Sequence, residues 1–215
     1  KEDLHQESVE ALKAGLQNLH KHVDTIRQYG LPFVVAINRF LSDTEMEIAE
    51  LKHWCAAQNI PVSLTEVWGK GGKGGIDLAN KLLKTIEEKE NNFQPLYPLE
   101  LSIVEKIRTV VQKVYGGKDV EFSSQAFKQI EEFERFGWSN LPVCIAKTQY
   151  SLSDDPLKVG RPTDFIIHVR ELKAKLGAGF IVALTGDVLT MPGLPKKPAA
   201  FQMDVDENGN AVGLF

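Results

Sequence analysis

Cysteine and long apolar runs are scarce in this sequence. Only 2 of its 215 residues are cysteines, and Cys55 and Cys144 belong to no cysteine–histidine cluster with the spacing of a zinc site. We therefore expect two reduced, structural thiols in apolar surroundings, no metal site and a cytoplasmic location. The apolar runs, such as residues 31–37, fall far short of the roughly 20 residues that cross a bilayer, which predicts no membrane partner.

Excess positive charge and a phosphate-binding motif are also missing. The chain has 25 Lys and Arg residues against 29 Asp and Glu residues, a formal net charge of −4. No broad basic field is available to attract a polyanion, so we expect no nucleic-acid partner. No stretch reads Gly-x-x-x-x-Gly-Lys-Ser/Thr, so a bound ligand would not be held by a phosphate loop of these residues.

The first 90 or so residues show alternating helix and strand patterns. Apolar residues at three- and four-residue spacing predict a surface helix over 3–29, and a capping-box pair predicts a second helix that ends near residue 58. The continuously apolar run 33–37 predicts a strand that is buried on both faces, as in a parallel sheet, and 61–65 predicts the next buried, parallel strand. A glycine-rich loop then leads to a helix over 76–89. This series predicts part of a doubly wound, mostly parallel α/β sheet.

A second module is expected to follow the irregular stretch 91–98, which holds two Asn and two Pro residues. We place the boundary between 1–92 and 93–215, and expect an α/β fold for the carboxyl-terminal module as well. Its predicted elements are helices over 101–116 and 127–137, strands at 143–146, 164–170 and 180–184, and a terminal hairpin over 203–214.

Three polar motifs have competing interpretations. Segment 204–209 matches the opening of a calcium loop, but the twelfth position, where a bidentate glutamate is needed, is Phe215; a hairpin turn is therefore favoured. Lys147-Thr148 is interpreted as a polar pair at a strand end, with hydrogen bonding to a ligand as the open alternative. The acid pair 154–155 is interpreted as solvated loop residues.

Two aromatic residues, Phe40 and Trp68, each follow the end of a predicted parallel strand. Open α/β sheets bind ligands at this edge. Two rings projecting from adjacent strand ends could sandwich a flat heteroaromatic ligand, each contact contributing on the order of 1 kcal/mol. The glycines and lysines of 69–75 would let the backbone approach a ligand, although such loops are also often simple connectors.

Six short motifs carry a family resemblance that spans essentially the whole chain: 34–38 (VVAIN), 70–72 (KGG), 141–143 (LPV), 146–151 (AKTQYS), 160–162 (GRP) and 191–195 (MPGLP). Together they resemble the carboxyl-terminal portion of formate-tetrahydrofolate ligase. The resemblance implies a P-loop NTPase-related fold and an ATP-dependent ligase that forms 10-formyltetrahydrofolate from formate and tetrahydrofolate through formyl phosphate. It also implies Mg²⁺ with the ATP, a monovalent cation and a homo-oligomer in the intact enzyme.

The resemblance assigns the folate site by position. Phe40 and Trp68 match the two rings that sandwich the pterin, Leu64 matches an apolar residue of the same pocket, and Asn38 with the Gly71-Gly72 pair supplies candidate loop contacts. The family's phosphate loop and catalytic basic residues match no part of these 215 residues. We therefore expect no catalytic residue here and no activity of the chain alone; the alternative is a non-catalytic folate-binding or assembly module.

Overall fold

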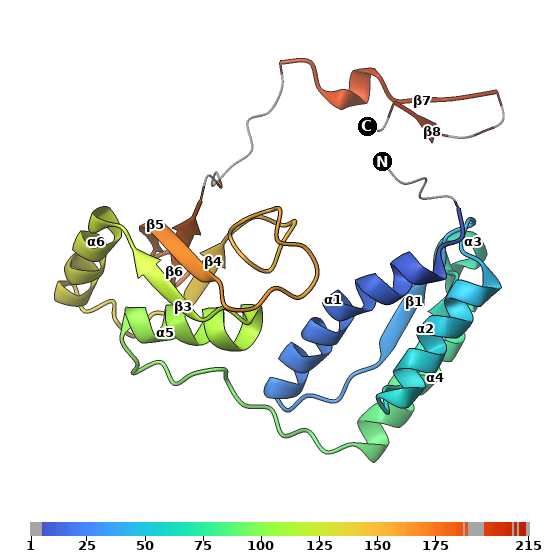
Figure 1. The fold of residues 1–215 in the computed structure, drawn as a ribbon, viewed down its shortest axis with the longest axis horizontal. Coiled ribbons are helices and arrows are strands. Elements are labelled where there is room, and N and C mark those ends of the chain that lie inside the picture. Colours follow the sequence, from blue (N-terminus) through green and yellow to red (C-terminus); the bar gives the residue numbers. More distant parts are fainter. Residues whose placement is uncertain (1–5, 187, 189–195, 208, 210, 214–215) are drawn as a thin grey trace.

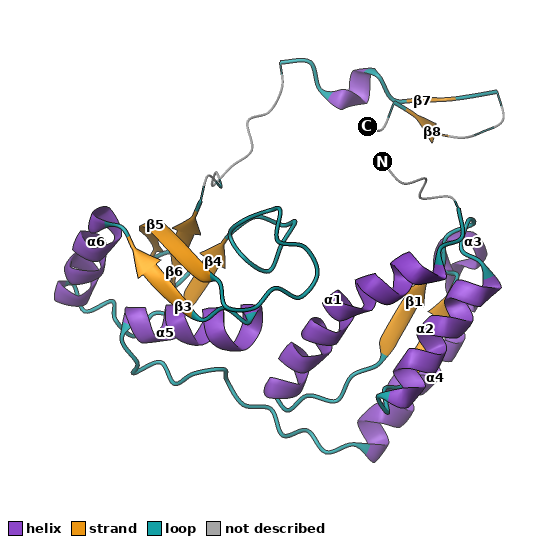
Figure 2. Ribbon diagram, in the orientation of Figure 1, coloured by secondary structure: helices purple, strands orange, loops and turns teal. Residues whose placement is uncertain are grey.

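Three sheets organise the α/β chain, which is seen in a computed structural model that describes residues 6–186, 188, 196–207, 209 and 211–213. Two strands form a parallel sheet, four form a mixed sheet in the order β3-β5-β6-β4, and two form an antiparallel hairpin. The parallel pair and the mixed sheet lie in separate parts of the molecule, each with its own helices (Figures 1 and 2). The α/β class is confirmed, and the relation to P-loop proteins stays a prediction.

The amino-terminal part alternates helices with two parallel strands. β1 (Val35–Asn38) and β2 (Val62–Thr65) are paired with Ile37 opposite Leu64, as expected for strands joined by a helical crossover. The parallel prediction is thus confirmed. α4 packs against β2, and α1 packs against α2. The helices of this part are α1 (Val9–Gln28), α2 (Glu45–Ala57), α3 (Val67–Lys70) and α4 (Ile76–Glu88).

The prediction that both strands are buried, β1 on both of its faces, is wrong. In β1 only Ile37 is buried, while Ala36 and Asn38 are exposed. In β2 the buried residues are polar, Ser63 and Thr65. The reason is the width of the sheet: with only two described strands, each strand has an unpaired edge, and the helices leave part of the pair uncovered.

Local hydrogen bonds explain how this part turns from strand to helix. The hydroxyl of Thr44 accepts from the backbone N–H of Glu47, whose carboxylate accepts from the N–H of Thr44 at 3.1 Å, so the predicted capping box is confirmed. The segment predicted as a glycine-rich loop is instead helical. α3 runs into a 3-10 helix, Gly71–Gly75, that leads directly into α4, because backbone bonds fold the segment back onto Glu66.

The carboxyl-terminal part is built on the mixed sheet. α5 (Ile103–Thr109) continues as a π-helix (Val110–Tyr115) that ends at Gly116, whose φ of 83° is left-handed. α6 (Ser124–Arg135) lies against β5. β3 pairs parallel with β5, β4 pairs parallel with β6, and β5 and β6 are antiparallel. The strands are β3 (Asp119–Phe122), β4 (Val143–Ala146), β5 (Ile166–Lys175) and β6 (Phe180–Thr185).

The sheet exceeds the prediction in two places. β3 was not predicted, because it has only four residues and two of them are acids, which are uncommon in strands. β5 continues to Lys175, past the predicted end at residue 170, because its second half pairs with β6 across the turn 176–179. The predicted alternation in its first half is confirmed, since Ile167 and Val169 are buried and His168 is exposed.

Each part has a hydrophobic core of its own. Val23, Cys55 and Ile60 form the smaller core, with Trp54 packed against it. The larger core fills the space between the mixed sheet and its helices. Its buried members are Ile103, Ile107, Val111, Val120, Ala126, Ile130, Phe133, Phe165, Ile167, Val169, Leu172, Ile181 and Ala183. The boundary between 92 and 93 itself stays a prediction.

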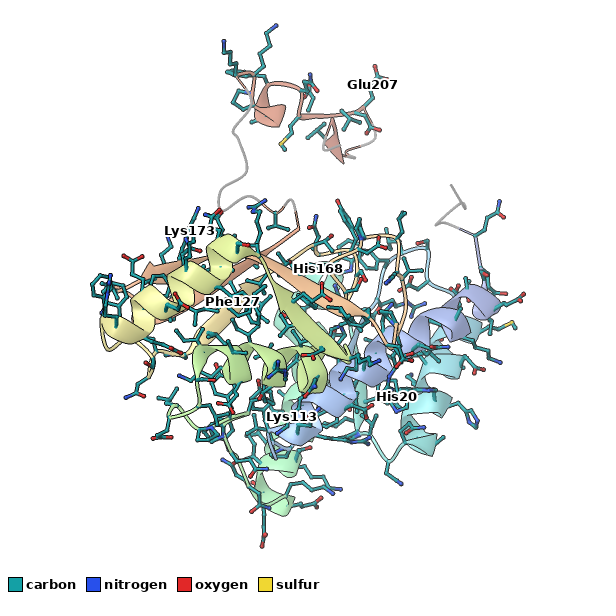
Figure 3. The ribbon with its side chains drawn as sticks, turned by 60° about the vertical axis from the view of Figure 1, so that its left-hand side comes forward. His20, Lys113, Phe127, His168, Lys173 and Glu207 are labelled. Carbon is teal, nitrogen blue, oxygen red and sulfur yellow. The ribbon has the colours of Figure 1, made fainter. Side chains whose placement is uncertain are left out.

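α1 joins the two parts. The ammonium of Lys21 donates to the carbonyl of Lys113 at 2.7 Å, and the side-chain amide of Gln28 donates to the same carbonyl at 2.9 Å. Figure 3 labels Lys113 beside this helix. Asp24 of α1 pairs with Arg161 at 2.7 Å. These contacts connect α1 to the π-helix and to the loop that precedes β5.

The last described strands, β7 (Asp204–Val205) and β8 (Ala211–Val212), form the predicted antiparallel hairpin. Gly209 in its turn has a φ of 82°, as a hairpin turn requires. The expected end of the hairpin at residue 214 lies outside the described residues. Within the described parts of the chain, no helix combines the length and the apolar character needed to span a membrane.

Candidate functional site

Phe40 and Trp68 lie on the walls of one cavity of about 350 Å³. Phe40 follows the carboxyl end of β1, and Trp68 lies in α3, just after the carboxyl end of β2. Both side chains are largely exposed, at 63% and 62% respectively, and neither ring contacts another aromatic ring of the described chain. Large aromatic side chains with this exposure are available to a ligand. The cavity is lined by Arg39, Phe40, Leu41, Glu66, Trp68, Gly69 and Lys70.

The indole of Trp68 is held in place although it is exposed. Its Nε1–H donates to the backbone carbonyl of Arg39 at 2.9 Å. The N–H of Arg39 donates in turn to the carbonyl of Thr65 at 3.1 Å, so the two strand ends are bonded to each other beyond the ladder. The ring is therefore oriented before any ligand arrives, which lowers the entropic cost of binding.

The backbone of Phe40 is fixed by the turn that follows β1. Its N–H donates to a carboxylate oxygen of Asp43 at 2.8 Å, and the N–H of Asp43 donates to the carbonyl of Phe40 at 3.2 Å. An aspartate side chain that bonds nearby backbone in this way stabilises a turn. Thr44, the N-cap of α2, comes next. The start of α2 thus positions the Phe40 side of the cavity.

The glycines after Trp68 are needed for close packing, at least at one position. The carbonyl of Gly74 accepts from the N–H of Glu66 at 3.1 Å. A Cβ added at Gly74 would lie 2.4 Å from the carbonyl oxygen of Glu66, far inside contact distance. Gly71 has a φ of 58° and a ψ of −149°, a conformation that is essentially restricted to glycine. The segment is therefore folded tightly against the end of β2.

One carboxylate and two cations line the cavity. The ammonium of Lys70 lies 2.5 Å from a carboxylate oxygen of Glu66, one helical turn earlier. The hydrogen bond from Lys70 and the charges of Lys70 and Arg39 hold the pKa of Glu66 below its ordinary value, against a smaller opposing effect of desolvation. Arg39 also pairs with Glu45 at 2.7 Å. At neutral pH the cavity therefore presents an ionised carboxylate next to an ammonium.

The other predicted site residues lie near this cavity but not on its walls. Leu64 is half-buried in β2, and Asn38 is exposed at the end of β1, opposite Thr65. Gly71 and Gly72 are exposed in the 3-10 helix, after the last lining residue. Their contact with a ligand stays a prediction.

Sequence reasoning missed Arg39, Leu41 and Glu66 as members of this site. Each directly follows a strand end or a predicted aromatic residue, so its position in the sequence indicates that it lies near the site. Their side chains, however, have no apolar or motif pattern that separates them from solvated loop residues. Only the fold shows that Glu66 and Lys70 are one turn apart and share a cavity with the two rings.

Lys147, predicted as one member of a polar pair at a strand end, forms hydrogen bonds within the loop that follows β4. Its ammonium donates to the carbonyl of Thr148 at 2.9 Å and to the carbonyl of Ser151. Desolvation lowers the pKa of this ammonium. The side chain also lines a second cavity, of about 550 Å³, next to α1. Ligand binding there stays an open alternative.

One sequence interpretation in this part is wrong, that of Asp154. Asp154 is not a solvated loop acid: its side chain is only 13% exposed and accepts from the backbone N–H of His168 at 2.8 Å. The long loop before β5 folds back over the strand, which sequence spacing does not reveal. The two cysteines are free and lie in apolar surroundings, as predicted. Cys55 is buried in the smaller core, whereas Cys144 is exposed on the wall of a mainly apolar cavity.

Metal ligands are not clustered in the described ranges of the chain, where no group of three or more His, Cys, Asp or Glu side chains could hold an ion. The site is thus an aromatic cavity with one ion pair. In the comparison with known proteins, the sequence model of the family described as formate--tetrahydrofolate ligase matches residues 1–215.

Proposed function

The chain belongs to the formate–tetrahydrofolate ligase family, and from this membership we propose that the cavity between Phe40 and Trp68 binds the pterin ring of tetrahydrofolate. The family joins formate to tetrahydrofolate with the use of ATP, within one-carbon metabolism. A pterin is flat and heteroaromatic, and two exposed rings on the walls of one cavity suit such a ligand. Phe40, Trp68 and Leu64 are the proposed folate-binding residues, with Asn38 and the Gly71-Gly72 pair nearby.

The observation that carries the proposal is the position of two exposed aromatic side chains at the carboxyl ends of adjacent parallel strands. Ligands of open α/β sheets bind at this edge. The cavity of about 350 Å³ falls within the range of small-molecule sites. Stacking of a flat ring on an aromatic side chain contributes about 1–3 kcal/mol per contact, so the two rings together would contribute about 2–6 kcal/mol to binding of the pterin.

For the reaction, we propose that these residues bind and orient the folate while other parts of the polypeptide handle ATP. A formate oxygen attacks the terminal phosphorus of ATP, ADP leaves, and formyl phosphate forms. A folate nitrogen then attacks the formyl carbon, inorganic phosphate leaves, and the nitrogen loses its proton. Phosphoryl transfer needs positioned cations and backbone donors around the phosphates, and the printed sequence contains no phosphate-loop motif for them.

The described residues offer no site for the Mg²⁺ that accompanies ATP, since no carboxylate or histidine cluster of ligand size is present among them. No step is therefore assigned to these side chains through a metal. We propose that the isolated chain is inactive. In this proposal the intact enzyme is a cytoplasmic homo-oligomer that also uses a monovalent cation. β1 and β2 would then belong to a wider, doubly wound sheet related to P-loop NTPases.

The direct test is anaerobic titration calorimetry of the chain with tetrahydrofolate. Trp68→Ala should weaken binding about 5- to 150-fold, because one stacking contact is lost. Trp54→Phe is the matched control, since Trp54 packs against the smaller core and has an edge contact with His20, away from the cavity. Equal binding by Trp68→Ala and the unmutated chain would contradict the assignment, and so would the absence of any binding by the unmutated chain.

A second candidate function, a non-catalytic assembly module, is favoured by one feature of α4. Leu82, Leu83 and Ile86 of this helix are exposed, at 45%, 59% and 61%, although its opposite face packs on β2. Exposed apolar side chains grouped on one element often mark a contact surface. Sedimentation velocity of the chain and of Leu83→Lys tests this candidate: a concentration-dependent dimer that dissociates in the variant would support it, and a monomer throughout would exclude it.

A further inference from the structure

Glu66 is the only acid among the described residues that line the aromatic cavity. It stands between the end of β2 and Trp68, and its backbone N–H is fixed by the carbonyl of Gly74 at 3.1 Å. Its side chain is 31% exposed, so the carboxylate is partly withdrawn from solvent but still reachable. A carboxylate held in this way in a cavity that two aromatic side chains also line can accept hydrogen bonds from a ligand.

Lys70 prepares that carboxylate for binding. The backbone N–H of Lys70 donates to the carbonyl of Glu66 at 2.9 Å, which sets the spacing of one helical turn. Its ammonium donates to Oε2 of Glu66, while Oε1 has no hydrogen-bond partner in the described chain. An ammonium has three N–H donors, so Lys70 keeps donors for a ligand. The pair thus presents acceptors next to a donor on one wall.

The chemistry of a pterin edge matches this arrangement. A 2-amino-4-oxo pterin carries, side by side, the C4 carbonyl as an acceptor and the ring N3–H and 2-amino group as donors. A carboxylate accepts two parallel N–H bonds, and charged partners make such bonds stronger than neutral ones. Building on the proposed function, we propose that the Lys70–Glu66 pair recognises this edge: Glu66 accepts from N3–H and the 2-amino group, and Lys70 donates to the C4 carbonyl.

Stacking alone would not give this selectivity. Aromatic walls accept any flat ring, because every such ring has a π-face. A site built to hydrogen-bond a ligand group rejects analogues that lack the group, since its own polar atoms are then left unpaired. In this proposal Phe40 and Trp68 provide most of the affinity, and Glu66 and Lys70 provide the selectivity for a pterin ring.

The test is a set of anaerobic calorimetric titrations with two ligands, tetrahydrofolate and its analogue in which a methyl group replaces the 2-amino group. Glu66→Gln should weaken tetrahydrofolate binding about 10- to 100-fold, the effect of losing charged hydrogen bonds. It should weaken binding of the analogue several-fold less, because the analogue keeps only the N3–H donor to Glu66. Glu88→Gln is the matched control, because Glu88 forms a similar ion pair with Lys84 on α4, away from the cavity lining. Glu88→Gln should leave the binding of both ligands unchanged.

Other outcomes separate this inference from the proposed function. Equal weakening of both ligands by Glu66→Gln, or no weakening of either, would overturn the inference while the Trp68 result still supports a pterin site. Guanosine monophosphate, whose base presents the same edge, is the competitor: tighter binding of this nucleotide than of tetrahydrofolate would reassign the cavity to guanine. Absence of folate binding by the unmutated chain would overturn both proposals together.

Discussion

Gly74 offers a sharp test of how the cavity is built, because its neighbour Gly72 provides an internal control. Both lie in the same 3-10 helix. An alanine Cβ at Gly74 would meet the carbonyl oxygen of Glu66 at 2.4 Å and its carbonyl carbon at 2.5 Å, whereas a Cβ at Gly72 would have nothing within 4 Å. Both clashing atoms belong to backbone at the end of β2, so a side-chain rotation does not relieve the contact.

The magnitudes follow from these contacts. In Gly74→Ala, forced displacement of backbone costs about 1–3 kcal/mol, and loss of the bond from Glu66 N–H to the Gly74 carbonyl adds about 0.5–1.5 kcal/mol. Alanine also lowers the conformational entropy of the unfolded chain, which offsets about 0.4–1 kcal/mol of this loss. We expect a net loss of about 2 kcal/mol in the free energy of unfolding. Gly72→Ala should be neutral or stabilising by about 0.5 kcal/mol, since only the entropy and helix-propensity effects act there.

Urea denaturation of both variants, monitored by circular dichroism, measures the free energy of unfolding. Titration calorimetry with tetrahydrofolate measures the affinity of the cavity for this ligand. Gly74→Ala should also weaken folate binding, because the displaced Glu66 backbone carries the segment that holds Trp68. Equal stability of the two variants would refute the steric argument. Normal folate binding by a destabilised Gly74→Ala protein would refute the link between this packing and the cavity.

Two further predictions concern titrating groups and thiols. The backbone N–H groups of Ser8 and Thr44 donate to the carboxylate of Glu47 and lower its pKa below 4.5. The stabilisation from this carboxylate is therefore fully present above pH 4.5 and is lost as the pH falls through the lowered pKa. Glu47→Gln should flatten the acid side of a stability–pH profile, and an unchanged profile would contradict this reasoning. Iodoacetamide in native conditions should modify Cys144 faster than Cys55, because Cys144 is exposed while burial raises the pKa of the Cys55 thiol; mass spectrometry of the labelled peptides checks this, and faster labelling of Cys55 would show the order to be wrong.

Sequence patterns determined the elements whose signals are local. The Thr44 and Glu47 pair predicts the start of α2, since the bonds of a capping box join residues three positions apart. Gly116 predicts the end of a helix in the same way, because a left-handed residue is needed there. The positions of Phe40 and Trp68 after two strands were enough to place both rings at one edge of a sheet.

Tertiary structure decided every feature that depends on residues far apart in the chain. The length of β5 is set by its antiparallel partner β6, the burial of Asp154 by its bond to His168, and the exposure of Cys144 by the face of β4 that meets the core. Glu66 is ordinary in sequence and becomes a site residue only because α3 and the 3-10 helix fold it against Lys70 and Gly74. Local patterns specify backbone conformation within a few residues, whereas burial, pairing and the composition of a cavity depend on which distant surfaces meet.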